Sequence, residues 1–357
     1  MENKVVLIMA GGTGGHIFPG LALAKEMLSR GYRVVWLGTE SGMESTLVPR
    51  ENIEIRYIPV KGVRGKGVKS LLMAPWNIVS SILAAARIIR DVKPNVVVGL
   101  GGFVAGPGGV ASKLKGKALV IHEQNAIAGS TNKLLSKIAD RVLTAFPAVL
   151  KRGECIGNPV RQEIEDIVEP RVRIQERDSQ VRLLVVGGSR GALAVNELVP
   201  AAMALIENPE QLDIWHQAGA GKDSATKALY DAEGIPARVD AFVDDMAEAF
   251  AWADVVVCRA GALTVSELAA VGLGAILIPF PYAIDDHQTA NANYLASQGA
   301  AFLRQQSELT SEKLAELLKS FIFDRTKLVD MACKARALAK PCAVKVFADY
   351  CEEVAHA

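Results

Sequence analysis

A glycine-rich turn near the start of the chain limits the possible folds more than any other stretch. Residues 5–10 are apolar and predict a short buried strand, and residues 11–20 have the sequence GGTGGHIFPG. We expect a helix that starts near Pro19 and continues over residues 21–28. Glycine lets a ligand approach the backbone, and the N–H groups of a helix start suit a phosphate. The turn therefore predicts either an anion site beside His16 or a tight structural turn.

The same unit of strand, glycine-rich turn and helix occurs twice more. Residues 95–98 precede the sequence GLGGFVAGPGG, and residues 181–186 precede the sequence GGSRGA. Further strands are expected at residues 33–37, 52–59, 118–121, 141–144, 212–216, 238–243, 255–258 and 275–279, with helices between them. This alternation predicts two doubly wound α/β domains, residues 1–160 and 161–340, with a weakly structured charged linker over 161–180.

Composition and charge narrow the functional classes. Half of the 357 residues are hydrophobic, enough for the cores of about two domains. The five cysteines include no C-x-x-C pair, which favours a reducing compartment over disulfides or zinc, and the apolar run before the first glycine is too short for a signal peptide. The net charge of +1 combines +11 over residues 1–157 with −10 over 158–357. Unless this imbalance is chance, the basic half indicates an anionic partner such as nucleic acid, phosphate or a membrane surface.

The segment from Lys69 to Arg87 is nearly long enough to span a membrane, but it contains a proline, an asparagine and three serines, and we reject a transmembrane helix. One interpretation is a crossover helix packed on the core, because its apolar residues recur at helical spacing: Ile78, Ile82, Ala85 and Ile89. The other is an anchor on an anionic membrane, formed by four apolar residues with basic neighbours: Leu71, Leu72, Met73 and Trp76 with Arg64, Lys66 and Lys69. We expect both, on different faces.

Polar groups gather where strands are expected to end. Because ligands of open α/β sheets bind at the carboxyl ends of the strands, Thr13, His16, the turn after Val98 and residues 122–125 should lie around one crevice. In the second half, two polar runs follow strands, RAGALTVSE at 259–267 and PFPYAIDDHQTANA at 279–292. Their side chains suit hydroxyl groups, although ordinary helix starts also favour such residues.

Three other functions can be weighed against these patterns. The sequence GGSRG fits the G-x-S-x-G elbow of α/β-hydrolases, but a hydrolase leaves the other two glycine turns unexplained. An NAD-dependent oxidoreductase is disfavoured because Ile17 stands where a G-x-G-x-x-G fingerprint from Gly12 needs glycine. A membrane-bound scaffold without catalysis does not require three such turns.

Taken together, the motifs GGTGGHIFPG, GGFVAGP, HEQNAIAG, IGNPVR, GGSRGA, CRAGALTVSE and DDHQTANA resemble the MurG family over the full length of the chain. The resemblance implies a GT-B architecture, in which two Rossmann-like domains face a cleft and the last helix, residues 341–357, packs back on the first. It implies transfer of N-acetylglucosamine from its UDP donor to the muramyl C4 hydroxyl of undecaprenyl-pyrophosphoryl-N-acetylmuramyl-pentapeptide, which converts lipid I into lipid II. A UDP-N-acetylglucosamine 2-epimerase on the same fold is the alternative, with no use for a basic apolar patch.

The resemblance also assigns individual residues. It places the acceptor on the first domain, at Gly14, Gly15, His16, Gly102 and Phe103. It places the donor mainly on the second, with Thr13 and Gly14 reaching across: Arg161 and Ser189 at the diphosphate, Val243 and Arg259 at the uracil, Glu267 at the ribose, and Asn125, Gln288 and Asn291 at the sugar. The sequence departs from the family at Arg190, where glutamine is expected, so the detail of the third turn is open.

The expected chemistry is a single inversion without a covalent intermediate. His16 is the best candidate for the base, since an ordinary histidine is partly neutral at pH 7, and Asn125 and His122 are weaker ones. The chain has no D-x-D sequence, and we expect neither a metal nor a cofactor. The resemblance implies a peripheral protein of peptidoglycan synthesis, cell shape and division at the cytoplasmic face of the bacterial inner membrane. Its expected partners are UDP-N-acetylglucosamine, lipid I and an anionic membrane surface, with cell-wall synthesis proteins as further candidates and no nucleic acid.

Overall fold

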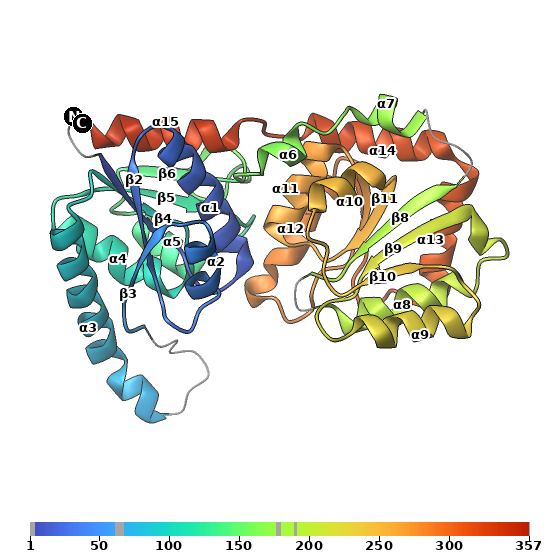
Figure 1. Ribbon diagram of the computed structural model, residues 1–357, viewed down its shortest axis with the longest axis horizontal. Coiled ribbons are helices and arrows are strands. Elements are labelled where there is room, and N and C mark those ends of the chain that lie inside the picture. Colours follow the sequence, from blue (N-terminus) through green and yellow to red (C-terminus); the bar gives the residue numbers. More distant parts are fainter. Residues whose placement is uncertain (1–3, 61–67, 176–179, 189–190, 357) are drawn as a thin grey trace. The chain divides into compact units, whose positions relative to one another are not determined.

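The computed structural model describes residues 4–60, 68–175, 180–188 and 191–356, without the side chains of 68–74, Gln175, Ile284 and Phe323. The chain forms two compact units (Figure 1). The first comprises Met1–Val160 together with Cys342–Ala357, and the second comprises Arg161–Pro341.

The first unit is built on a seven-stranded parallel sheet with the order β3-β2-β1-β4-β5-β6-β7. Its strands are β1 (Val5–Met9), β2 (Arg33–Gly38), β3 (Glu54–Tyr57), β4 (Val96–Gly99), β5 (Ala118–Glu123), β6 (Arg141–Thr144) and β7 (Glu154–Cys155). Its helices are α1 (Gly14–Ser29), α2 (Glu44–Arg50), α3 (Val68–Val92), α4 (Gly102–Leu114), α5 (Ser130–Leu135) and α15 (Ala343–Ala355).

Both faces of this sheet are buried, which explains why its strands are continuous apolar runs. Because side chains alternate along a strand, Val6 and Ile8 pack on one side in a cluster with residues of α1 and α15. Leu7 and Met9 pack on the other side with residues of α3 and α4. Helices thus cover both faces, as expected for a parallel sheet.

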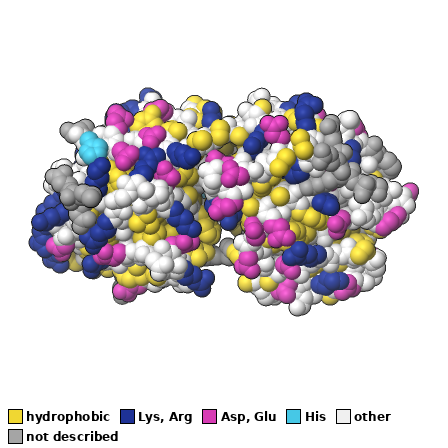
Figure 2. All heavy atoms as spheres, turned by 45° about the horizontal axis from the view of Figure 1, so that its top comes forward, with side chains coloured by type: hydrophobic (Ala, Val, Ile, Leu, Met, Phe, Trp, Pro, Cys, Tyr) yellow, Lys and Arg dark blue, Asp and Glu magenta, His cyan; other side chains and the backbone are white. Residues whose placement is uncertain are grey.

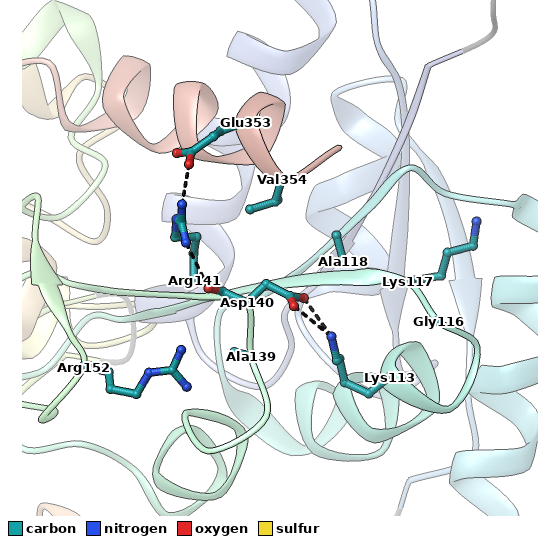
Figure 3. Close-up of a pocket in the computed structure, with 10 residues that line it drawn as sticks. All are labelled: Lys113, Gly116, Lys117, Ala118, Ala139, Asp140, Arg141, Arg152, Glu353 and Val354. Carbon is teal, nitrogen blue, oxygen red and sulfur yellow. Dashed lines mark hydrogen bonds and ion pairs between the residues drawn. The ribbon is translucent and has the colours of Figure 1, made fainter. Parts of the chain in front are cut away.

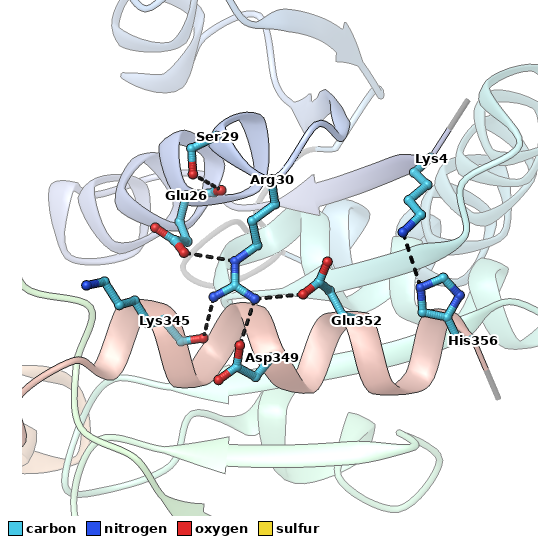
Figure 4. Close-up of polar contacts among 8 residues, drawn as sticks. All are labelled: Lys4, Glu26, Ser29, Arg30, Lys345, Asp349, Glu352 and His356. Atoms are coloured by element: carbon cyan, nitrogen blue, oxygen red, sulfur yellow. Dashed lines mark hydrogen bonds and ion pairs between the residues drawn. The ribbon is translucent and has the colours of Figure 1, made fainter. Parts of the chain in front are cut away.

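The final helix, α15, is part of the first unit. Its Phe347 and Cys351 are fully buried in the cluster on the α1 side of the sheet. Arg30, at the end of α1, donates hydrogen bonds to the carboxylates of Asp349 and Glu352, each at 2.7 Å, and to that of Glu26 at 2.8 Å (Figure 4). Apolar burial and this ion-pair cluster together hold the C-terminal helix on α1.

The second unit repeats the design with a six-stranded parallel sheet in the order β10-β9-β8-β11-β12-β13. Its strands are β8 (Val181–Val186), β9 (Leu212–Gln217), β10 (Arg238–Asp240), β11 (Val255–Cys258), β12 (Gly274–Leu277) and β13 (Ala301–Leu303). The helices are α6 (Gln162–Glu165), α7 (Pro170–Gln175), α8 (Leu193–Met203), α9 (Asp223–Ala232), α10 (Met246–Trp252), α11 (Ala262–Val271), α12 (His287–Ala296), α13 (Ser311–Phe323) and α14 (Arg325–Ala337). Short 3₁₀ turns lie at Pro209–Gln211 and Ile284–Asp286.

The structure confirms the predicted class of two parallel-sheet α/β domains and each predicted strand, within three residues at either end. The short strands β7 and β13 are not predicted. The expected helix start near Pro19 is wrong, because α1 begins at Gly14 and the carbonyl of Thr13 accepts the N–H groups of His16 and Ile17. The predicted linker contains the helices α6 and α7.

The buried face of α3 differs from the predicted one toward the N-terminal end of the helix. Ala85 and Ile89 are fully buried and Ile82 packs against the core, but Ile78 is 49% exposed. The buried position one turn before Ala85 belongs to Ser81, whose hydroxyl donates to the carbonyls of Pro59 and Asn77, each at 2.8 Å. Within the part of α3 whose side chains are described, the buried face therefore begins only at Ser81, and the N-terminal part of the helix projects beyond the domain (Figure 1). Over the described residues, no helix meets the length and apolarity that a membrane span requires.

Candidate active site

Each sheet has a point where the strand order reverses, between β1 and β4 in the first unit and between β8 and β11 in the second. In doubly wound sheets, ligands bind at the carboxyl ends of the strands at this point. The sequence GGTGGH follows β1, the turn at Gly101 follows β4, the GGSRGA turn follows β8, and Arg259 follows β11. Both switch points therefore carry predicted motifs.

The first turn is held by a buried acid that sequence reasoning missed. Glu44, on α2, is fully buried and accepts the backbone N–H of Gly12 at 3.1 Å. Its second oxygen accepts the N–H and the hydroxyl of Thr39, at 2.9 and 2.8 Å. No local signal marks Glu44, because its partners come from two other turns.

The second turn needs glycine for reasons of both space and backbone angle. Gly101 and Gly102 have φ values of +101° and +76°. A Cβ at Gly101 would lie 2.9 Å from Cε1 of His16, and one at Gly102 would lie 2.3 Å from the carbonyl oxygen of Gly11. The two turns thus touch through glycines, and the ring of His16 rests on Gly101. Phe103, in the first turn of α4, is 59% exposed.

Residues at the end of β5 form a buried chain of contacts with His16. Nδ1 of His16 lies 2.9 Å from Oε1 of Gln124. Nε2 of Gln124 lies 3.1 Å from Nδ1 of His122, and Nε2 of His122 lies 2.8 Å from the carbonyl oxygen of Gly157. His122 and Gln124 are almost inaccessible to solvent, whereas His16 is half-buried.

The prediction of His122 as a weaker candidate for the base is wrong, because the structure leaves its ring no access to a ligand. Burial lowers the pKa of His122 to about 4, although the hydrogen bond to Gly157 and the charge of Glu123 oppose this shift. Both ring nitrogens are occupied by protein contacts and neither faces solvent. His16 is the histidine of this group that a ligand can reach.

Asn125 is fixed by its neighbour Glu123, another buried acid. One carboxylate oxygen of Glu123 accepts the backbone N–H of Asn125 at 3.0 Å and its side-chain amide at 3.3 Å. The other accepts from the N–H of Gly129 at 3.0 Å and from the amide of Asn132 at 2.9 Å. Sequence reasoning placed residues 122–125 at the crevice but did not identify Glu123 and Gln124 as the groups that organise it.

In the second unit, the turn after β8 also depends on glycine. Gly191 has a φ of +68°, and a Cβ there would lie 2.2 Å from the carbonyl oxygen of Ala218. Its N–H donates to the carbonyl of Gly188 at 2.8 Å. Ser189 is predicted at the diphosphate, and Arg190 stands where the family is expected to have glutamine. Both lie outside the described residues.

Arg259 connects the loops after β11 and β12. Its guanidinium donates to the carbonyls of Ile278 and Pro279, at 3.2 and 3.1 Å, and to Oε1 of Gln306 at 2.6 Å. Burial lowers the pKa of Arg259. In this structure it braces the loop around the predicted uracil region, and Val243, predicted in the same region, is buried.

Glu267 and Arg161 form a pair at the predicted donor site. A guanidinium nitrogen of Arg161 lies 3.5 Å from a carboxylate oxygen of Glu267. Burial raises the pKa of Glu267 to about 7, while the charge of Arg161 and its hydrogen bond oppose the rise. Glu267 can therefore change between donor and acceptor of hydrogen bonds near neutral pH.

Gln288 and Asn291, on α12, hold the two polar loops of the second unit. Oε1 of Gln288 accepts the backbone N–H of Phe280 at 2.9 Å. Asn291 is fully buried, and its amide nitrogen donates to the carbonyl of Ala260 at 3.2 Å. Both amides thus fix backbone groups at the ends of β11 and β12.

A separate pocket of about 500 Å³ opens where β5 and β6 begin, at the other ends of the strands from His16 (Figure 3). Basic residues contribute much of its lining, but Lys113 pairs with Asp140 at 2.9 Å and Arg141 pairs with Glu353. None of the sequence motifs lies here.

Basic side chains also gather at the left edge of the first unit in Figure 2.

The predicted membrane segment is described only in part. Lys66 lies outside the described residues, and Lys69, Leu71, Leu72 and Met73 are in α3 without described side chains. Trp76 is 71% exposed, and Leu83, two turns later, is 55% exposed. Val79, between them at helical spacing, is also exposed, so Trp76, Val79 and Leu83 form an exposed apolar stripe on α3.

Residues 6–144 match the glycosyltransferase family 28 N-terminal domain, and residues 182–347 match the C-terminal domain of the same family. A relative from Saccharophagus degradans is 50% identical over 99% of this chain and 92% of its own length. It is named UDP-N-acetylglucosamine--N-acetylmuramyl-(pentapeptide) pyrophosphoryl-undecaprenol N-acetylglucosamine transferase.

Two solved structures bear on the alternatives. The crystal structure of Acinetobacter baumannii MurG is 42% identical and superimposes with a TM-score of 0.87 over 98% of this chain and 99% of that one. A putative UDP-N-acetylglucosamine 2-epimerase from Listeria monocytogenes is 13% identical, with a TM-score of 0.65 over 97% of this chain and 95% of that one. The second likeness concerns the fold alone, so the epimerase alternative is not favoured.

Proposed function

The chain belongs to glycosyltransferase family 28, and we propose that it transfers N-acetylglucosamine from UDP-N-acetylglucosamine to lipid I, giving lipid II and UDP. The observation that carries this proposal is the similarity to relatives that are named for that reaction. They are 50% identical to this chain over 99% of its length. The reaction is a step of peptidoglycan synthesis.

We assign the base to His16. It lies on the first turn of α1, and among the described residues its Nε2 has no hydrogen-bond partner, so an acceptor hydroxyl can take that place. The glycine N–H groups around it, at Gly14, Gly15 and Gly102, suit the acceptor pyrophosphate. Phe103 is exposed beside them and suits the acceptor's sugar.

We assign the donor to the carboxyl ends of β8, β11 and β12. The leaving UDP gains negative charge as the glycosidic bond breaks, and Arg161, Ser189 and the N–H groups of the third turn can stabilise it. Glu267 suits the ribose hydroxyls, Val243 and Arg259 the uracil, and Gln288 and Asn291 the sugar. Thr13, Gly14 and Asn125 are assigned to the donor from the first unit.

We also propose that the protein works on the cytoplasmic face of the inner membrane, where its lipid-linked acceptor is embedded. The exposed stripe at Trp76, Val79 and Leu83 supports this location, because apolar side chains of a surface helix can enter the headgroup region. The excess of basic residues in the first half favours an anionic surface.

A transfer assay tests the function. Radiolabelled UDP-N-acetylglucosamine is incubated with lipid I or a short-chain analogue, and label should enter the lipid with one UDP released per sugar. His16→Ala should lower turnover by roughly 10²–10⁴-fold with donor binding nearly intact. The matched control is His356→Ala, an exposed histidine near Lys4, which should leave turnover unchanged. Conversion of the donor in the absence of acceptor would instead indicate an epimerase.

A further inference from the structure

The buried chain of contacts behind His16 has a direction that is set at one end by a backbone carbonyl. The oxygen of Gly157 can only accept, so Nε2 of His122 must carry the proton of their 2.8 Å hydrogen bond. Burial keeps the pKa of His122 at about 4, so this ring is neutral at pH 7 and has only one N–H. Nδ1 of His122 is therefore an acceptor.

Two contacts fix the orientation of the side-chain amide of Gln124. Its Nε2 lies 3.1 Å from Nδ1 of His122, which accepts, and 3.2 Å from the backbone oxygen of His122, which can only accept. Both contacts require the amide nitrogen on this side. The carbonyl oxygen of Gln124 must then face His16, 2.9 Å from its Nδ1.

An amide oxygen next to Nδ1 requires a proton on that nitrogen. The other neutral tautomer of His16 would place two lone pairs opposite each other at 2.9 Å. Gly101 lies against the ring, and Nε2 makes no hydrogen bond to any residue that the structure describes. Nε2 is thus left with its lone pair toward the site.

We propose that Gln124 and His122 are positioning residues for the transfer reaction: they hold the neutral ring of His16 with its proton on Nδ1, so that Nε2 receives the proton of the acceptor hydroxyl. This inference rests on the proposed function. In the step, the hydroxyl oxygen bonds to the anomeric carbon, the bond from that carbon to UDP breaks with its electron pair leaving on UDP, and the hydroxyl proton moves to Nε2. The resulting imidazolium has two N–H groups, so its hydrogen bond to Gln124 persists.

Neighbouring residues hold the chain of contacts from His16 through Gln124 to His122, which we call the relay, in a rigid arrangement. Phe347, on α15, stacks on the ring of His122 with ring centroids 5.2 Å apart. The backbone carbonyl of Gln124 accepts the amide of Asn158 at 3.2 Å, and that of His122 accepts the amide of Asn132 at 3.2 Å. Because these contacts are buried, water cannot replace either partner without disrupting the end of β5.

Nitrogen NMR of the unliganded protein tests the tautomer directly. With ¹⁵N-labelled histidine at about pH 8.5, where an ordinary imidazole is neutral, His16 should show a protonated Nδ1 and an unprotonated Nε2. His16→Ala assigns its signals. A protonated Nε2 in the wild-type protein would overturn the proposal, whatever the behaviour of any variant.

Gln124→Met removes the amide and keeps most of the volume. We expect the His16 signals to shift toward the Nε2-protonated form and kcat to fall about tenfold or more, with the KM for UDP-N-acetylglucosamine unchanged. The control is Gln298→Met, which makes the same change at an exposed glutamine of the second unit. It should keep the wild-type His16 spectrum, and an unchanged spectrum and kcat in Gln124→Met would count against the relay.

The two proposals fail separately. If the protein transferred no sugar but His16 carried its proton on Nδ1, the function would be wrong and the geometry of the relay would stand. If transfer occurred with His16 protonated on Nε2, only the relay would be wrong.

Discussion

The buried carboxylate of Glu44 accepts the backbone N–H of Gly12 at 3.1 Å, across 32 positions of sequence. Its other oxygen accepts two donors of Thr39. One side chain on α2 therefore joins the turn after β1 to the turn after β2. The shape of the glycine turn beside His16 depends on this acid as well as on its own glycines.

We expect Glu44→Ala to destabilise the first unit. The change removes the acceptor of three part-buried hydrogen bonds, which should lower the free energy of unfolding by about 2–4 kcal/mol. Urea denaturation measures the loss. Glu51→Ala is the control, because Glu51 pairs with Lys25 at the surface and should cost less than about 1 kcal/mol. Similar losses in the two variants would contradict a bracing role for Glu44.

Gly101→Ala should slow catalysis without weakening the binding of the donor. The new Cβ would lie 2.9 Å from Cε1 of His16 at a φ of +101°, so the ring must move. Since small displacements of a catalytic group are costly, turnover should fall by about tenfold or more. UDP binding, measured by calorimetry, should hardly change, because its contacts are assigned mainly to the second unit.

Gly116→Ala separates this effect from backbone strain. Gly116 also has a positive φ, +62°, but a Cβ there meets nothing within 4 Å. It should lose about 1 kcal/mol of stability and keep full turnover. Equal turnover in the two variants would show that the position of His16 on Gly101 does not matter.

The pKa of Glu267 gives the second unit a distinct pH dependence. Burial raises this pKa from 4.5 to about 7, so the folded state binds the proton more tightly than the unfolded state. The stabilisation is complete below pH 4.5 and is lost as the pH rises through about 7. Between pH 5 and 7.5 the loss should be about 2–3 kcal/mol.

Comparison with Glu267→Gln isolates this contribution, because glutamine does not titrate. The free energy of unfolding of the wild type, relative to this variant, should fall from pH 5 to pH 7.5 in urea titrations. Glu248→Gln, at an exposed site on α10, should show a constant difference over the same range. A constant difference for Glu267→Gln as well would mean that this carboxyl titrates normally.

The sequence predicts the elements better than it predicts what supports them. Continuous apolar runs such as residues 5–9 identify strands buried on both faces, and the glycine turns predicted at strand ends lie at the two switch points that the structure reveals. The helix start at Gly14 is missed because two glycines are poor helix formers, and the contact of this turn with the Gly101 turn outweighs their low propensity.

Long-range polar contacts are where the prediction ends. Gln124 reaches His16 across 108 positions, and Glu44 reaches Gly12 across 32, so no local pattern pairs them. The exposure of Ile78 is missed for a related reason, since helical spacing alone does not say where a helix leaves the core. Such facts depend on tertiary packing.

Binding to membranes should depend on the exposed stripe of α3. Trp76 and Leu83 are 71% and 55% exposed, and each apolar side chain that enters a bilayer interface contributes on the order of 1 kcal/mol or more. Trp76→Ser with Leu83→Ser should therefore weaken partition onto vesicles of anionic phospholipid by about tenfold or more, as measured by sedimentation. Leu193→Ser with Leu205→Ser removes exposed leucines of the second unit and should leave partition unchanged. If the two double variants bound alike, the stripe would have no part in attachment. If both transferred sugar to a soluble acceptor analogue at the wild-type rate, the loss would be specific to the membrane.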